Sequence, residues 1–134
     1  AGEITYGLER ILMYVQNKEN VYDLDYNEYE DLKSRISYGD VFQRAEAEFS
    51  AYSLEKANVE TLLSQFNELE KECHSLLHCK LTLPAYDLCI KCSHLFNLLD
   101  ARGLISTTER ASYIARVRDM ARNCCKTWLD NQPK

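Results

Sequence analysis

Two hydrophobic periods meet in the first fifteen residues of the chain. In Ile4-Thr5-Tyr6 successive side chains alternate between two faces, which is the period of a β-strand. After Gly7 the apolar residues recur at intervals of three and four, the period of an amphipathic helix; they are Leu8, Ile11, Leu12 and Val15. The pattern therefore predicts a short strand that runs directly into a helix, with the change of period at Gly7.

The chain beyond residue 38 shows four more stripes at helical spacing. One helix covers about residues 40–49, and a second begins near Asn58, whose side chain suits an N-cap. A third opens at Pro84 and ends before Gly103, and the last begins at Ser106 with a capping-box sequence. Their apolar stripes, in order, are Val41, Phe42, Ala45 and Phe49; Leu62, Phe66, Leu69, Cys73 and Leu76; Leu88, Cys92, Leu95 and Leu99; Ile114, Val117, Ala121, Cys124 and Trp128. We expect a mainly α fold, in which a short N-terminal strand and helix precede a bundle of about four helices.

Residues 25–37 break the periodic pattern, because acidic residues and tyrosines alternate there without a sustained repeat. We interpret this segment as an acidic, tyrosine-rich connector, and expect three regions: residues 1–24, 25–37 and 38–134. Such a loop is more typical of a solvated connector than of a surface that binds a basic partner.

Composition narrows the class of protein. The 134 residues are 46% hydrophobic, yet no apolar run approaches the length of a membrane span, and no signal peptide is visible. The net charge of −5 argues against a general nucleic-acid-binding domain, so any nucleic-acid contact must be local. Six cysteines without a secretion signal indicate a reducing compartment, and we expect a cytoplasmic protein.

The cysteines and histidines also allow a metal hypothesis. Cys73, His74, His78 and Cys79 lie close together in the sequence, and Cys89 and Cys92 have the spacing of a zinc knuckle. Cys73, Cys89 and Cys92 nevertheless fall on or beside apolar stripes, where a free cysteine behaves as a small hydrophobe. We therefore expect no zinc, and keep a small zinc-binding helical scaffold as a minor alternative.

The opening segment, Gly2-Glu3-Ile4-Thr5-Tyr6-Gly7-Leu8-Glu9-Arg10, resembles motif 3 of the class II aminoacyl-tRNA synthetases. Together with Tyr38-Gly39-Asp40-Val41-Phe42 and the block His94-Leu95-Phe96-Asn97-Leu98-Leu99-Asp100-Ala101-Arg102-Gly103, the chain resembles the carboxyl-terminal part of the alpha subunit of bacterial tetrameric glycyl-tRNA synthetase. The resemblance extends from Gly2 to about Trp128. It implies an ATP-dependent ligase of translation, with Mg²⁺ accompanying the ATP, that forms glycyl adenylate from glycine and transfers the glycyl group to tRNA(Gly).

The resemblance also implies residue roles and partners. Arg10 is expected to be catalytic and to contact ATP, and Gly7 would let the nucleotide approach the backbone. Glu3 and Thr5 would face the glycine pocket, with Glu3 binding the ammonium group. An ordinary strand-to-helix connection with a surface Glu-Arg pair is the simpler alternative. The implied partners are a beta subunit or a fused beta region, tRNA(Gly), and a second alpha chain in the parent enzyme.

Class II motifs 1 and 2 should precede motif 3, but this chain lacks them and begins with Ala1. We infer that it is a fragment of a longer polypeptide, and predict that it cannot activate glycine by itself.

The last helix carries a basic face of Arg116, Arg118, Arg122 and Lys126. These cations could meet tRNA phosphates or acidic residues of the beta subunit, or form an ordinary solvated face. The rival to the ligase assignment is a noncatalytic helical module that docks protein or tRNA.

Overall fold

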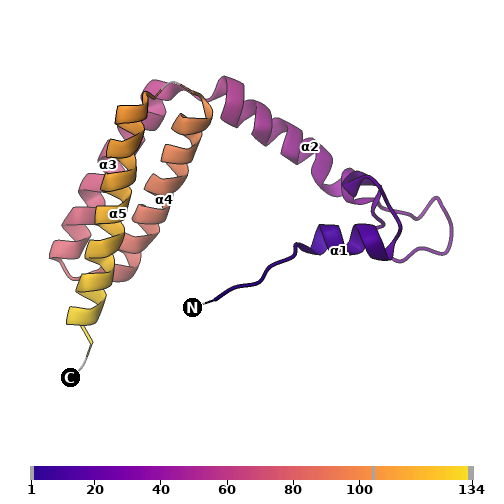
Figure 1. The fold of residues 1–134 in the computed structure, drawn as a ribbon, viewed down its shortest axis with the longest axis horizontal. Coiled ribbons are helices and arrows are strands. Elements are labelled where there is room, and N and C mark those ends of the chain that lie inside the picture. The colour runs from indigo at the N-terminus through magenta and orange to yellow at the C-terminus, as the bar shows by residue number, and fades with distance from the viewer. Residues whose placement is uncertain (1, 104, 133–134) are drawn as a thin grey trace. The chain divides into compact units, whose positions relative to one another are not determined.

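A computed structural model describes residues 2–103 and 105–132 and is mainly helical, as predicted. The helices, in chain order, are α1 (Leu8–Val15), the short 3₁₀ helix η1 (Val21–Asp23), α2 (Tyr38–Ala51), the π-helical turn η2 (Tyr52–Lys56), α3 (Val59–His78), α4 (Thr82–Ala101) and α5 (Thr107–Asp130) (Figure 1). The chain divides into two compact units, Ala1–Ala51 and Tyr52–Lys134, which we describe separately.

The expected N-terminal strand does not form. Residues 2–6 have no regular secondary structure, and the β-pairing in the described part of the chain is one isolated bridge between Asp25 and Ser37. A strand is held by hydrogen bonds to a neighbouring strand, and no described residue supplies one to this segment. The alternating pattern was therefore not sufficient to define a strand.

The helices of the first unit form where the pattern predicts them, but their apolar stripes stay uncovered. Leu8 and Val15 of α1 are each 74% exposed. On α2, Val41 and Phe49 are exposed as well, so the expected inner face of this helix is not a core face. Only Phe42 of that stripe is half-buried, with ring centroids 4.6 Å from Tyr38 and 5.6 Å from Tyr26.

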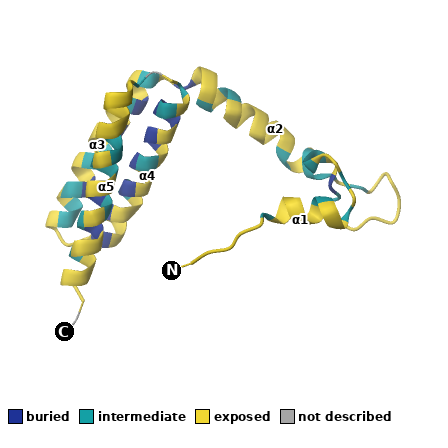
Figure 2. Cartoon of the chain, viewed as in Figure 1, coloured by how far each residue is buried: buried dark blue, intermediate teal, exposed yellow. Residues whose placement is uncertain are grey.

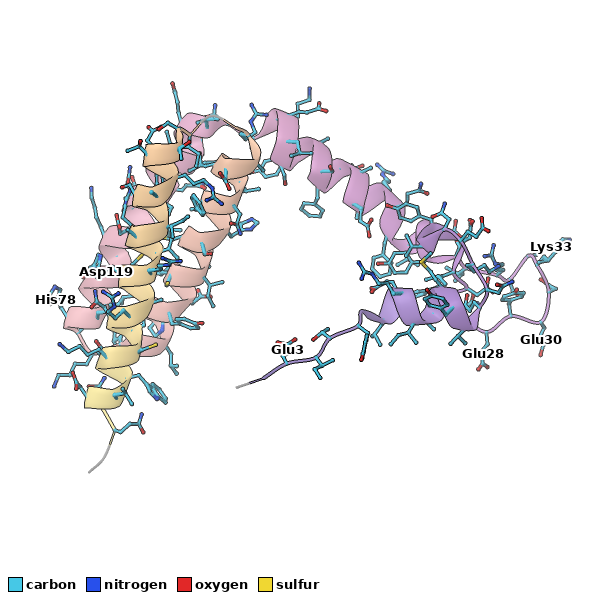
Figure 3. All side chains as sticks on the ribbon, in the orientation of Figure 1. Glu3, Glu28, Glu30, Lys33, His78 and Asp119 are labelled. Atoms are coloured by element: carbon cyan, nitrogen blue, oxygen red, sulfur yellow. The ribbon has the colours of Figure 1, made fainter. Side chains whose placement is uncertain are left out.

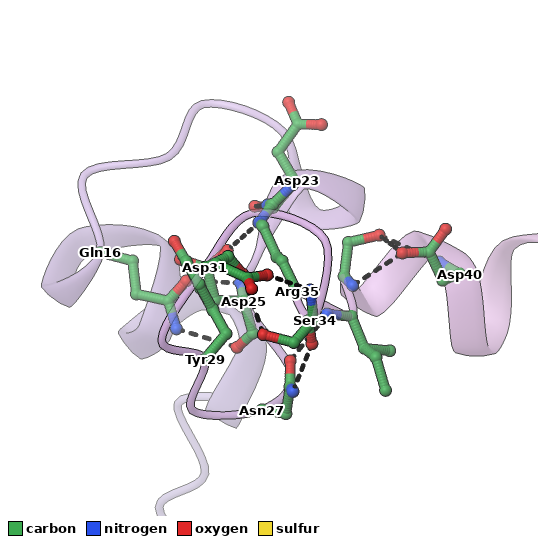
Figure 4. A network of polar contacts seen from close by, with 11 residues as sticks. Gln16, Asp23, Asp25, Asn27, Tyr29, Asp31, Ser34, Arg35 and Asp40 are labelled. Carbon is green, nitrogen blue, oxygen red and sulfur yellow. Dashed lines mark hydrogen bonds and ion pairs between the residues drawn. The ribbon is translucent and has the colours of Figure 1, made fainter.

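The connector of residues 25–37 is irregular, as expected, and its ends are tied together by polar contacts (Figure 4). The side chain of Gln16 donates to the carbonyl oxygen of Asp25 over 3.1 Å and accepts from the Asp25 amide over 2.7 Å. Arg35 donates to the carboxylate of Asp25 and, over 2.7 Å, to the carbonyl oxygen of Asp23. The hydrogen bond from Arg35 lowers the pKa of Asp25. These contacts fix the loop against the end of α1.

The second unit is a bundle of three helices, α3, α4 and α5, rather than about four (Figure 1). Its buried residues lie on the inner faces of these helices and include Leu62, Phe66, Cys73, Cys92, Leu95, Leu99, Met120 and Cys124 (Figure 2). The core residues come from α3, α4 and α5 together with Ala57, and α2 is part of the first unit.

The ends of the bundle helices are set by local chemistry, largely as predicted. Asn58 accepts the Thr61 amide over 2.9 Å, and Ser106 and Glu109 form the expected capping box. The third predicted helix begins at Thr82, two positions before Pro84, which lies in its first turn. Gly103 follows the end of this helix with a φ of +63°, a conformation that favours glycine.

No helix in the described part of the chain has both the length and the apolar character needed to cross a membrane.

Candidate functional site

The junction between the N-terminal segment and α1 depends on Gly7. This residue has φ +81° and lies directly before the first helical residue, and its carbonyl oxygen accepts the Ile11 amide over 3.3 Å. A residue with a Cβ atom is strained at this φ, whereas glycine is not. The glycine thus lets an extended segment turn sharply into the helix.

Arg10 follows in the first turn of α1, with an exposed side chain. No carboxylate of the described residues lies within ion-pair distance of its guanidinium. The side chain borders an open surface hollow of about 420 Å³, lined by Arg10, Met13, Tyr14, Asn17, Lys18 and Glu19. Arg10 therefore presents a free, planar cation beside a hollow.

Glu3 and Thr5 lie together on the extended segment before Gly7, with Glu3 reaching into solvent (Figure 3). The Thr5 hydroxyl donates a hydrogen bond to the Glu3 carboxylate, so both side chains do project to one side, as the alternation predicted. Neither is joined to Arg10 by a hydrogen bond or ion pair within residues 2–103 and 105–132. The two predicted parts of the site are thus near in sequence but not in contact.

The basic face of α5 is smaller than the sequence suggested. Arg118, Arg122 and Lys126 are exposed, and Arg122 lies 3.9 Å from the carboxylate of Asp119. Arg116 instead turns toward α3, because a position two residues before Arg118 lies about 200° around the helix.

Arg116 forms a polar and aromatic cluster between α3 and α5. Its Nε donates to Oε1 of Glu70 over 2.9 Å, and its Nη2 donates to Oδ1 of Asn67 over 2.7 Å. The guanidinium carbon lies 4.5 Å from the ring centroid of Phe66 and 5.0 Å from that of Tyr113. Hydrogen bonding to Arg116 lowers the pKa of Glu70. The arrangement is an internal tie between helices rather than a free cation.

An apolar groove between α4 and α5 was not anticipated from the sequence. It has a volume of about 370 Å³ and is lined by Thr82, Leu83, Tyr86, Cys124, Cys125, Trp128 and Leu129. Trp128 was expected on the core stripe but is 47% exposed. The signal that could have revealed the groove is Leu83 and Tyr86, which lie off the core stripe of the predicted helix.

The thiols divide into buried and exposed groups. Cys73, Cys89, Cys92 and Cys124 are buried, whereas Cys79 and Cys125 are exposed. Burial raises the pKa of Cys73 to about 12 and that of Cys92 to about 11. Within the described residues no three potential metal ligands lie close enough to hold an ion. The buried thiols act as apolar side chains of the core.

A comparison with known protein families shows a match that covers nearly the whole chain. Residues 1–133 match the family model described as glycyl-tRNA synthetase alpha subunit.

Proposed function

Since the chain belongs to the glycyl-tRNA synthetase alpha subunit family, we propose that it is the part of a glycine-tRNA ligase that completes the site of glycine activation. In this reaction the glycine carboxylate attacks the α-phosphate of ATP to form glycyl adenylate and pyrophosphate, and the glycyl group then passes to tRNA(Gly). The family match over residues 1–133 is the observation that carries the proposal.

We propose that Arg10 binds ATP and stabilises the charge that develops during adenylate formation. A guanidinium is permanently charged and binds phosphate oxygens through paired N–H donors. The free guanidinium of Arg10 and the turn at Gly7 support this role, because the side chain has no described internal partner to give up. Mg²⁺ would accompany the nucleotide and would supply further neutralisation of phosphate charge when bound.

For glycine itself, we assign Glu3 to the ammonium group and Thr5 to orienting Glu3. Both assignments come from the family resemblance, and the hydrogen bond from Thr5 to Glu3 supports them. A fixed carboxylate recognises an ammonium by charge and by direct hydrogen bonds.

The chain alone is not expected to activate glycine. Glu3, Thr5 and Arg10 are all exposed, and the hollow beside Arg10 is open. Adenylate formation needs an enclosed site from which water is excluded. We propose that the enclosing residues belong to the longer parent polypeptide, which acts in the cytoplasm with a second alpha chain and with the beta subunit or a fused beta region.

The test is ATP–pyrophosphate exchange by the intact parent, supplied with its beta subunit, with glycine and with other amino acids. The proposal predicts exchange that requires glycine. It also predicts that Glu3→Gln increases the KM for glycine, whereas the loop variant Glu30→Gln leaves that KM unchanged. Exchange with no amino acid would favour the noncatalytic docking module instead. Glycine-dependent exchange by the 134-residue chain alone would contradict the proposal that the residues enclosing the site belong to the parent polypeptide.

A further inference from the structure

We propose that the groove between α4 and α5 is the docking site for one acidic amphipathic helix of the beta subunit. The proposal goes beyond glycine activation and rests on the same family membership. It concerns residues of the second unit only.

The groove is the apolar surface of a bundle that lacks a fourth helix. Leu83 and Leu129 are 67% and 71% exposed on its two sides, and Trp128 is 47% exposed. The exposed apolar surface continues along α4 to Ile90, at 53%. Adding one helix here would complete the bundle and remove these side chains from water.

The charges beside the groove indicate the kind of helix. Arg118, Arg122, Cys125 and Leu129 follow one another at intervals of four, three and four, so they form a single strip along α5. The two arginines therefore lie in line with the groove wall. Arg118 has no ion-pair partner among the described residues, and Arg122 has only the distant Asp119. A helix in the groove would place acidic residues opposite these two cations.

The geometry also sets the length of the occupant. The strip from Arg118 to Leu129 covers eleven residue steps, or about 16 Å along the helix axis. A partner helix of about three turns, with apolar residues at i, i+3 or i+4, and i+7, matches this length. Trp128, which is partly exposed near the apolar end of the strip, would be the main apolar anchor.

Other occupants fit less well. A small ligand would need oriented polar groups, but the surface that lines the groove is apolar. tRNA would be bound by the exposed cations Arg118, Arg122 and Lys126, but the surface that lines the groove is apolar and holds no cation for a phosphate. A two-fold contact between two copies would bring the same arginine strip to the interface twice, without acidic residues from the strip to pair with it.

The experiment is calorimetric titration of the full chain with the beta subunit, or with the beta region of a fused parent, expressed as a separate polypeptide. Trp128→Ala should weaken binding at least thirtyfold, the scale of an interface hot spot. Leu83→Asp and Leu129→Asp test the groove independently, because both side chains are largely outside the core. The matched control is Leu32→Asp, an 81% exposed leucine of the first unit.

The charged rim is tested with the double variant Arg118→Glu/Arg122→Glu. Binding should weaken more than tenfold at low salt and less at high salt, since exposed charges are screened. Lys71→Glu, an exposed charge reversal on α3, is the control. Circular dichroism should show unchanged folding for every variant.

Three results would overturn the proposal. The groove variants could bind the beta polypeptide as tightly as wild type. The groove variants could weaken self-association of the chain in sedimentation, which would assign the groove to a second copy. The arginine variants could lose tRNA(Gly) binding while keeping the beta polypeptide, which would assign the rim to tRNA. None of these measurements uses ATP or glycine, so failure here is distinct from failure of the exchange assay.

Discussion

The cluster around Arg116 is predicted to stabilise the three-helix bundle by about 2 kcal/mol. Replacing Arg116 with Met keeps an unbranched apolar stem over Phe66 but removes the guanidinium and its hydrogen bonds to Glu70 and Asn67. The charged contact with Glu70, counted as one interaction, contributes roughly 1.5–3 kcal/mol. Partial exposure, 30% for the Arg116 side chain and 19% for Glu70, reduces that contribution, while the aromatic contact adds about 0.5–1 kcal/mol.

The assay is urea unfolding monitored by the fluorescence of Trp128, the single tryptophan, which reports on α5. With a urea dependence of about 1–3 kcal/mol per molar, a loss of 2 kcal/mol lowers the midpoint by roughly 1 M. The matched control is Arg122→Met on the same helix, whose contact with Asp119 is exposed and 3.9 Å long. That variant should lose less than about 0.5 kcal/mol.

A double-mutant cycle separates the ion pair from the loss of packing. Arg116→Met, Glu70→Gln and the double variant should give a coupling energy of about 1–2 kcal/mol. If Arg116→Met is no more destabilising than Arg122→Met, or if the coupling is zero, then the cluster does not tie α3 to α5 as the distances suggest.

Three further results are expected. Arg116 lowers the pKa of Glu70 in the folded protein below the unfolded value of about 4.3. The stability that this pair contributes is therefore present above that pH and is lost as the pH falls through the folded pKa. Urea unfolding across pH 3–7 should show that wild type is more stable than Glu70→Gln at neutral pH and loses this difference only on the acid side. A thiol reagent at pH 8 should modify Cys79 and Cys125 rapidly and the four buried thiols only on unfolding, and six equally fast thiols would contradict the buried assignment. Ser106→Ala should cost about 1 kcal/mol in the same urea assay by removing the capping box, and a loss near zero would show that the box does not stabilise α5.

The helices were predictable because their signals are local. Asn58 and Ser106 each begin a helix by accepting a hydrogen bond from a backbone amide three residues later, and Gly103 adopts a left-handed conformation after the end of a helix. Each signal therefore depends on residues that are close in sequence. The confirmed stripe of α3, with Leu62, Phe66 and Cys73 buried, follows from the helical period alone.

The failures concern contacts that the local pattern does not contain. An apolar stripe predicts that a face can be buried, but not which surface buries it, and so Val41 and Phe49 on α2 remain exposed. In the same way, alternation in Ile4-Thr5-Tyr6 cannot supply the neighbouring strand that a sheet requires. The spacing of cations along α5 predicts that Arg116 belongs to the basic face. It does not show that Glu70 of α3 lies close enough to bind Arg116.

The candidate site was predictable only in part. The change of period at Gly7 and the position of Arg10 in the first turn were readable from the sequence, and the structure has both features. The roles of these residues came from the family resemblance, because an exposed arginine has no chemistry that distinguishes it from any other surface cation. The groove between α4 and α5 could not be predicted from the core stripe of α4, because Leu83 and Tyr86 lie outside that stripe.

The most direct test of the account is the rate of glycyl adenylate formation by the intact parent, with its beta subunit, in wild type and in Arg10→Ala. The account predicts a fall in kcat/KM for ATP by a factor of about one hundred or more, the scale for loss of one preorganised charge contact. Arg44→Ala, which removes an exposed arginine of α2, should leave the rate unchanged. A rate within twofold of wild type for Arg10→Ala would contradict the assignment of this residue to ATP.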